Sequence, residues 1–155
     1  KNPVSVLKRT KQRPRLTPRT DCLDTKEMKA AVAFLSNHQN RTAANALTLL
    51  LLTGARKREI TELKYLEVNF IKRVISLPAD RIKTKQPRQI PCTEAIMSIL
   101  QEQATLRNPL NPHIFQGNGL NPIGRHHLEQ AFRALQTELS RHDLIIHGLR
   151  RSYIS

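Results

Sequence analysis

Residues 43–60 read AANALTLLLLTGARKREI, and the fold is best predicted from this segment. Its first part, 43–52, is apolar on nearly every side of a helix, which is typical of a helix buried at the centre of a domain. Gly54 ends that helix, and Arg56 follows almost at once. Because an unpaired guanidinium is costly to bury, Arg56 is expected to face a partner, and Glu59, one helical turn later, can brace it.

Hydrophobic spacing outside this stretch predicts further helices and a few short strands. The helices are expected over 25–38 (capped by Asp24 or Thr25), 55–66, 93–106, 122–140 and from 146 or 147 onward. Segments rich in β-formers, at 67–71, 74–77 and 89–91, are expected to form a small antiparallel sheet. The sequence therefore predicts a mainly α fold with a small antiparallel β-sheet.

The chain has 155 residues, a length that suits a single folded unit. Lys and Arg number 26 against 12 acidic residues, so the formal charge is 26 − 12 = +14, which favours a polyanionic partner. No segment is long and apolar enough to cross a bilayer. The two cysteines, Cys22 and Cys92, lack CxxC spacing, which suits a reducing compartment.

The basic charge is concentrated at the start of the chain. Residues 1–20 hold seven basic side chains, three prolines and no acid, a composition typical of an extended linker. The other residues, 21–155, hold 19 basic and 12 acidic side chains, or +7, so the expected folded part is basic as well.

Two further clusters carry chemistry. Residues 80–88, DRIKTKQPR, lie between expected strands, where basic loop tips can reach phosphate oxygens. Residues 145–153, IIHGLRRSY, place His147 and Arg150 on one face of a helix. Each cluster by itself is also typical of an ordinary solvent-exposed basic surface.

The joint order of these motifs resembles a known family. Thr-Gly-x-Arg-x-x-Glu after an apolar helix, a lysine shortly before Ile-Pro, and His-x-Leu-Arg-Arg-Ser opening a helix are similar to the catalytic domain of the tyrosine recombinases, or phage integrases, over residues 24–155. The resemblance implies a tyrosine-recombinase catalytic-domain fold that acts on double-stranded DNA. It further implies site-specific recombination, by strand cleavage and rejoining through a 3′-phosphotyrosyl intermediate, with no cofactor and no metal.

The resemblance also implies roles for individual residues. Arg56, His147 and Arg150 match catalytic positions, with Glu59 in support. Lys83 matches the hairpin lysine by its distance from Pro91, and Lys85 is the alternate if the hairpin register slips by two. The basic side chains nearby are expected to bind DNA: Lys57, Arg58, Arg81, Lys85, Arg88 and Arg151.

The chain also departs from the family pattern, which continues to a second His or Trp and then to the tyrosine nucleophile. We expect 21–155 to be a C-terminally truncated catalytic domain, preceded at 1–20 by the linker from a missing core-binding domain. Tyr153 is expected to be a core packing residue and Tyr65 a structural one. The parent is expected to be bacterial or phage-encoded, cytoplasmic and nucleoid-associated, and to act in a tetrameric synapse; this piece is expected to be monomeric and inactive in cleavage.

Three alternatives remain open at this stage. They are a DNA-binding module without catalysis, a type IB topoisomerase, and a metal-dependent nuclease that uses His126, His127 and His142. Adjacent histidines on a helix point about 100° apart, and no acidic cluster accompanies these three, which disfavours the nuclease. The remaining histidines singled out, His38 and His113, are expected at the surface.

Overall fold

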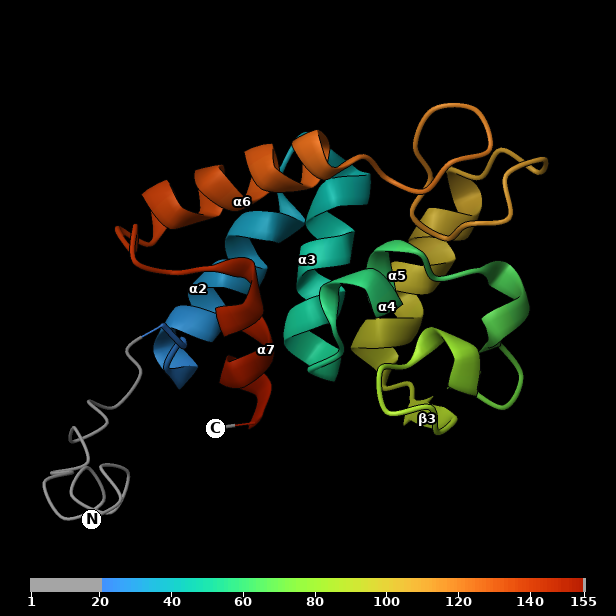
Figure 1. Ribbon diagram of the computed structural model, residues 1–155. Coiled ribbons are helices and arrows are strands. Elements are labelled where there is room, and N and C mark those ends of the chain that lie inside the picture. The colour runs from blue at the N-terminus through green and yellow to red at the C-terminus, as the bar shows by residue number, and fades with distance from the viewer. Residues whose placement is uncertain (1–20, 155) are drawn as a thin grey trace, which may run out of the picture.

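Helix α3 (Arg41–Thr53) lies at the centre of the fold. Its residues are buried on every side from Ala43 to Leu51, as the run of apolar residues predicts. Helices α2, α5, α6 and α7 all pack against it, so a single core surrounds this helix (Figure 1). The computed structural model describes residues 21–154; the predicted basic linker at 1–20 lies outside them.

The surrounding helices begin and end near the predicted positions. They are α2 (Thr25–Ser36), α5 (Glu94–Thr105), α6 (Arg125–Glu138) and α7 (Ile146–Ile154). Asp24 caps α2 by accepting a 2.7 Å hydrogen bond from the Glu27 backbone, while the Glu27 carboxylate accepts one from the Asp24 backbone. Helix α2 ends two residues before the predicted His38, because Asn37 caps its C-terminus.

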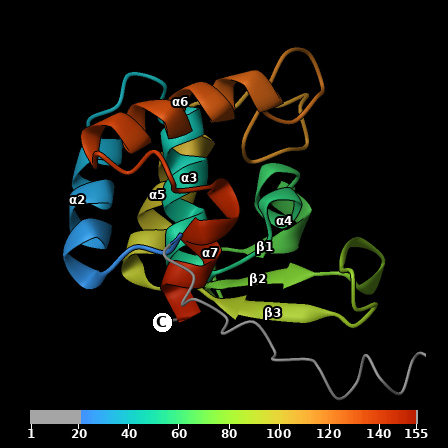
Figure 2. The ribbon, with the colours of Figure 1, turned by 60° about the vertical axis from the view of Figure 1, so that its left-hand side comes forward.

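The sheet holds three short antiparallel strands in the order β1 (Val68–Asn69), β2 (Val74–Leu77) and β3 (Arg88–Pro91). Ile75 pairs with Ile90, and both side chains are buried, so one face of the sheet joins the core. Figure 2 shows this sheet on the opposite side of the molecule from α2. The predicted mainly α fold with a small antiparallel sheet is confirmed.

The helix predicted over 55–66 is much shorter in the structure. Helix α4 covers only Lys57–Thr61 and is followed by a 3₁₀ turn, η1 (Tyr65–Glu67). Helix α4 ends because the backbone after it pairs with a distant segment. The Ile114 amide donates to the Leu63 carbonyl at 2.8 Å, and Lys64 and His113 form an isolated antiparallel β-bridge. A long-range contact thus overrides local helix propensity.

Two other boundaries shift for local reasons. The strand predicted over 67–71 stops at Asn69, whose side-chain oxygen accepts from the Ile71 and Lys72 amides and closes a turn. Helix α6 begins at Arg125, because the Ile123 amide donates to the Phe115 carbonyl at 2.8 Å and keeps the preceding residues outside the helix.

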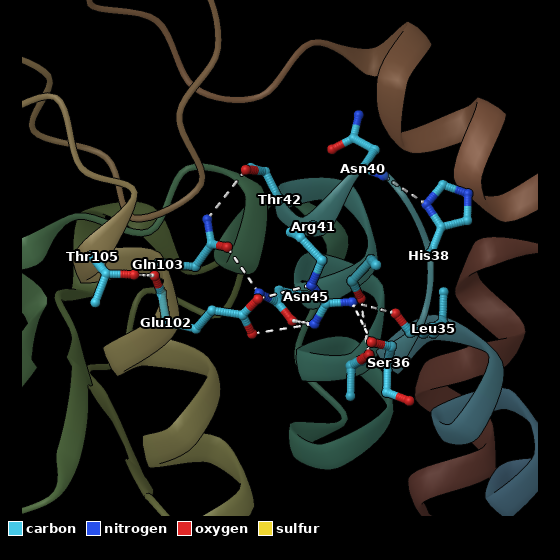
Figure 3. A network of polar contacts seen from close by, with 12 residues as sticks. Leu35, Ser36, His38, Asn40, Arg41, Thr42, Asn45, Glu102, Gln103 and Thr105 are labelled. Atoms are coloured by element: carbon cyan, nitrogen blue, oxygen red, sulfur yellow. Dashed lines mark hydrogen bonds and ion pairs between the residues drawn. The ribbon is translucent and has the colours of Figure 1, made fainter.

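A partly buried polar network joins α2, α3 and α5 (Figure 3). Arg41 donates to the Glu102 carboxylate at 2.8 Å and to the Leu35 carbonyl at the end of α2 at 2.7 Å. Asn45 donates to Gln103 at 2.9 Å, and both amides are almost fully buried. These contacts satisfy polar groups inside the helical layer and fix how the helices meet.

Among residues 21–154, no helix has both the length and the apolar composition that a membrane span requires.

Candidate functional site

The turn after α3 positions Arg56. Gly54 takes the left-handed conformation (φ 62°) that ends α3, and Arg56 then forms the N-cap of α4. Glu59 accepts from the Arg56 backbone amide at 2.8 Å and from its guanidinium at 3.2 Å. The contact between Glu59 and Arg56 that the sequence predicts is therefore present. Glu59 is only 2% exposed, so this carboxylate is an internal brace.

A second arginine reaches the same carboxylate. Arg88 lies at the start of β3, and its guanidinium is 3.4 Å from the second oxygen of Glu59. Sequence reasoning placed Arg88 only among general DNA contacts and missed this shared partner. No local spacing could have revealed the contact, since the two residues lie 29 positions apart.

Helix α7 brings Arg150 to this group. Burial, and next the positive charge of Arg56, lower the pKa of Arg150, while Glu59 opposes the shift and Arg88 adds to it. The charges of Arg56, Glu59 and Arg88 thus all act on Arg150, and a guanidinium keeps its positive charge in proteins. His147 is exposed one helical turn before Arg150, so the two share a face of α7.

A basic cavity of about 470 Å³ extends from Arg56 to the connection between β2 and β3. Lys83 and Lys85 both line it, and both side chains are exposed. The cavity also holds acidic side chains that sequence reasoning did not single out, Glu62 and Asp80.

The connection between β2 and β3 carries both candidates for the hairpin lysine, Lys83 and Lys85. Leu77 pairs with Arg88 at the end of the ladder, so Lys83 and Lys85 lie in the loop beyond the strands, after the 3₁₀ turn η2 (Ala79–Arg81). A slip in strand register would therefore not put Lys85 in the place of Lys83, because strand register does not fix the positions of loop residues. Both lysines reach the same cavity.

The other basic residues predicted to bind DNA have varied surroundings. Lys57 is half-buried, and Arg58 is exposed and pairs with Glu62 at 3.0 Å. Arg81 forms an ion pair with Glu67, and Arg151 forms one with Asp21. DNA contact by these residues stays a prediction.

The described tyrosines occupy different surroundings. Tyr65 donates to the Gln103 carbonyl at 3.2 Å, and the Arg107 guanidinium lies 4.1 Å from its ring centre, which agrees with a structural role. The prediction that Tyr153 is a core residue is wrong: it is 54% exposed. Its ring covers Gly54, which has no side chain to fill that space.

The two histidines expected at the surface are only partly exposed. The His38 ring accepts from the Asn40 amide, and the His113 ring lies 3.0 Å from the Asn111 side chain. Burial lowers the pKa of His113. Within residues 21–154, no group of three His, Cys, Asp or Glu side chains is arranged to hold a metal ion; His126, His127 and His142 are exposed.

Known proteins resemble this chain in sequence and in fold. The phage integrase family matches residues 21–155. The prophage integrase IntF of Escherichia coli K12 is 32% identical over 143 residues, which is 86% of this chain and 28% of that protein. The chain therefore spans little more than a quarter of this relative's length.

Solved structures share the fold. The Tn1549 transposon integrase in complex with a circular intermediate DNA superimposes with a TM-score of 0.71 at 19% identity, covering 88% of this chain and 52% of that one. The XerH site-specific recombinase bound to difH substrate gives 0.71 at 17% identity, covering 86% and 41%.

The family match and the 32% identity to a prophage integrase place the chain in the catalytic-domain class of the tyrosine recombinases. The chain belongs to the phage integrase family.

Proposed function

We propose that the gene product carrying this chain performs site-specific DNA recombination, by cleaving and rejoining duplex strands, and that residues 21–154 supply its phosphate-binding site. One observation carries the proposal: the buried Glu59 braces Arg56 beside a cavity that holds Lys83 and Lys85, and the charges of Arg56 and Glu59 also act on Arg150. Separate stretches of a +14 chain thus contribute to one cationic site.

The two arginines suit a phosphodiester under attack. Negative charge grows on its nonbridging oxygens, and guanidiniums hold such oxygens with paired, charge-assisted hydrogen bonds. Glu59 keeps Arg56 in place without neutralising the whole site, because Arg88 and Arg150 add positive charge around it. The donors are thus held before the phosphate arrives, as electrostatic catalysis requires.

The proposed step conserves the energy of the phosphodiester bond. A tyrosine hydroxyl, contributed from elsewhere in the gene product, loses its proton to solvent and attacks the phosphorus, and the bond from phosphorus to the 5′ oxygen breaks. Lys83, with Lys85 as the alternate, donates a proton to the departing 5′ oxygen, and His147 hydrogen-bonds the same phosphate. A 5′ hydroxyl then loses its proton and attacks the phosphorus of the 3′-phosphotyrosyl ester. The bond from phosphorus to the tyrosine oxygen breaks, the tyrosine regains a proton, and the strand is rejoined, so neither ATP nor a metal is needed.

Double-stranded DNA is the proposed partner. The Tn1549 integrase and XerH, which share this fold, were solved with DNA, and the positive charge of this chain favours the phosphate backbone. We further propose a tetrameric synapse for the gene product and a nucleoid-associated, cytoplasmic location.

Binding tests the phosphate site directly. We expect Arg150→Ala to weaken binding of the 155-residue chain to duplex DNA, and to reduce the slope of log Kd against log salt by about one, since one phosphate contact is lost. Fluorescence anisotropy over a salt series measures this. Lys29→Ala, an exposed change on α2, is the control and should leave the slope unchanged. An unchanged slope for Arg150→Ala would count against the site.

Cleavage tests the reaction. The full gene product should form a covalent adduct with nicked duplexes of randomised sequence, and Arg56→Ala should slow adduct formation by about 10²-fold to 10³-fold. Denaturing gels measure the adduct. Binding without any adduct would identify a DNA-binding module that lacks catalysis. Relaxation of supercoiled plasmid without site preference would identify a topoisomerase.

A further inference from the structure

The short segment Asp21–Leu23 contacts the helix that carries His147 and Arg150. We call this segment the latch. It holds α7 through backbone and side-chain contacts that the proposed reaction does not use, and this lets its effect be tested separately.

The first contact is a close approach between two backbones. A Cβ atom placed on Gly148 would lie 1.9 Å from the Asp21 carbonyl oxygen, far inside any real contact. Only glycine therefore lets the first turn of α7 lie directly on the latch.

The second contact is a chain of hydrogen bonds through Ser152. Its hydroxyl accepts from the Leu23 amide at 2.7 Å and donates to the Gly148 carbonyl at 2.8 Å. Ser152 is 3% exposed, so these bonds form away from solvent, where they are stronger. Arg151 adds an ion pair to Asp21.

The latch is itself fixed in the protein. The Leu23 side chain is buried in the core, and the Cys22 carbonyl accepts from Arg141 at 3.4 Å. Asp24, the next residue, caps α2. Because these contacts hold the latch in place, the latch can set the position of α7, which packs on it.

The contacts lie away from the phosphate-binding face of α7. At about 100° per residue, the mean direction of Gly148 and Ser152 lies roughly 150° around the helix from that of His147 and Arg150. The latch therefore contacts α7 on the side away from His147 and Arg150. A rotation or shift there moves both functional side chains together.

We propose that Ser152 and Gly148 are positioning residues, through which the latch sets the orientation of His147 and Arg150 toward the phosphate. The inference rests on the proposed function of that site. A misplacement of about 1 Å can lower a reaction rate by about 10²-fold, so a small shift of α7 matters for rate more than for DNA affinity.

The test compares Ser152→Ala with Thr48→Ala in the full gene product. Thr48 also donates its hydroxyl to a carbonyl one turn earlier and is nearly buried, but it lies on α3 and does not contact the latch by any hydrogen bond in the described structure. We expect Ser152→Ala to lower the single-turnover cleavage rate at saturating DNA by about 10-fold or more. Its Kd for duplex DNA should stay within about 2-fold, and Thr48→Ala should change neither.

Two further variants test the same contacts. Ser152→Thr keeps a hydroxyl at this position and should retain most of the cleavage rate. Gly148→Ala, whose added Cβ collides with the Asp21 carbonyl, should lower the cleavage rate as Ser152→Ala does. Melting temperatures separate unfolding from misplacement. Equal rates for Ser152→Ala and Thr48→Ala at equal Tm would overturn the inference.

Hydrogen exchange separates this inference from the proposed function. In the 155-residue chain, the Leu23 amide should be protected, and Ser152→Ala should remove that protection. If the wild-type gene product shows no cleavage while the Leu23 amide is protected, the proposed function fails and the latch contact stands. If cleavage occurs and Ser152→Ala leaves its rate unchanged, the latch proposal alone fails.

Discussion

Glu59 shows how much a single buried side chain can organise. Its carboxylate accepts from the backbone and guanidinium of Arg56 and lies 3.4 Å from the guanidinium of Arg88. A carboxylate in this position is costly to bury and is tolerated because its oxygens are paired. The same pairing holds the arginines in a geometry suited to a phosphate.

Replacement of this carboxylate should affect both stability and the site. We expect Glu59→Gln to lower the free energy of unfolding by about 1–3 kcal/mol, because a charged acceptor is lost from a buried site. Urea denaturation of the 155-residue chain measures this. Glu62→Gln is the matched control, since its pair with Arg58 is largely solvent-exposed, and it should cost less than about 0.5 kcal/mol. Equal losses would contradict the bracing role of Glu59.

At the scale of elements, the junction between α3 and α4 depends on α7. Gly54 ends α3 with φ 62°, and a Cβ on this residue would lie 2.4 Å from the Tyr153 ring. The ring of Tyr153 therefore packs where only glycine leaves room. The contact between Gly54 and Tyr153 therefore fixes the turn that carries Arg56 against the helix that carries Arg150.

This fit predicts a difference between two glycines. Gly54→Ala should destabilise the chain by more than the roughly 1–2 kcal/mol that a left-handed conformation costs alanine, because the Tyr153 ring must also move. Gly119→Ala is the control: Gly119 has φ 63°, but its added Cβ meets no atom within 4 Å. Thermal unfolding compares them.

A second mutation completes the argument. In a Tyr153→Ala background, the cost of Gly54→Ala should fall to that of Gly119→Ala. A cost that stays the same in both backgrounds would show that the ring contact contributes nothing.

At the scale of the whole molecule, charge pairing ties the helical layer together. The hydrogen bond from Arg41 is the largest influence that lowers the pKa of Glu102, so the folded state favours the charged carboxylate. A carboxylate whose pKa is lowered on folding stabilises the fold above its unfolded pKa, and this contribution disappears as the pH falls through the lowered value.

The pH dependence of stability therefore has a definite sign. Glu102→Gln should lower the free energy of unfolding by about 1 kcal/mol or less near neutral pH, as expected for a partly exposed pair. The difference from the wild-type chain should shrink as the pH falls below the ordinary glutamate pKa of about 4.3, and it should vanish as the pH passes through the lowered pKa of Glu102. Urea titrations over a pH series measure it. A difference that grows on acidification would refute this account.

The central helix, the small sheet and the family could all be predicted from local patterns in the sequence. Ala43–Leu52 had to be buried because no side of such a helix suits water, and the order of the motifs around Arg56 and His147 carries the family pattern. The contact between Arg56 and Glu59 was also predictable, since it joins neighbours on one helical turn.

The remaining features depend on contacts between residues far apart in the chain, so they could be seen only in the folded protein. Helix α4 ends early where its backbone meets the segment at Ile114, and Arg88 joins Glu59 across 29 positions. Ser152 meets Leu23 across 129 positions. Local propensity and spacing carry no information about such pairs, whereas packing around one shared core brings them together.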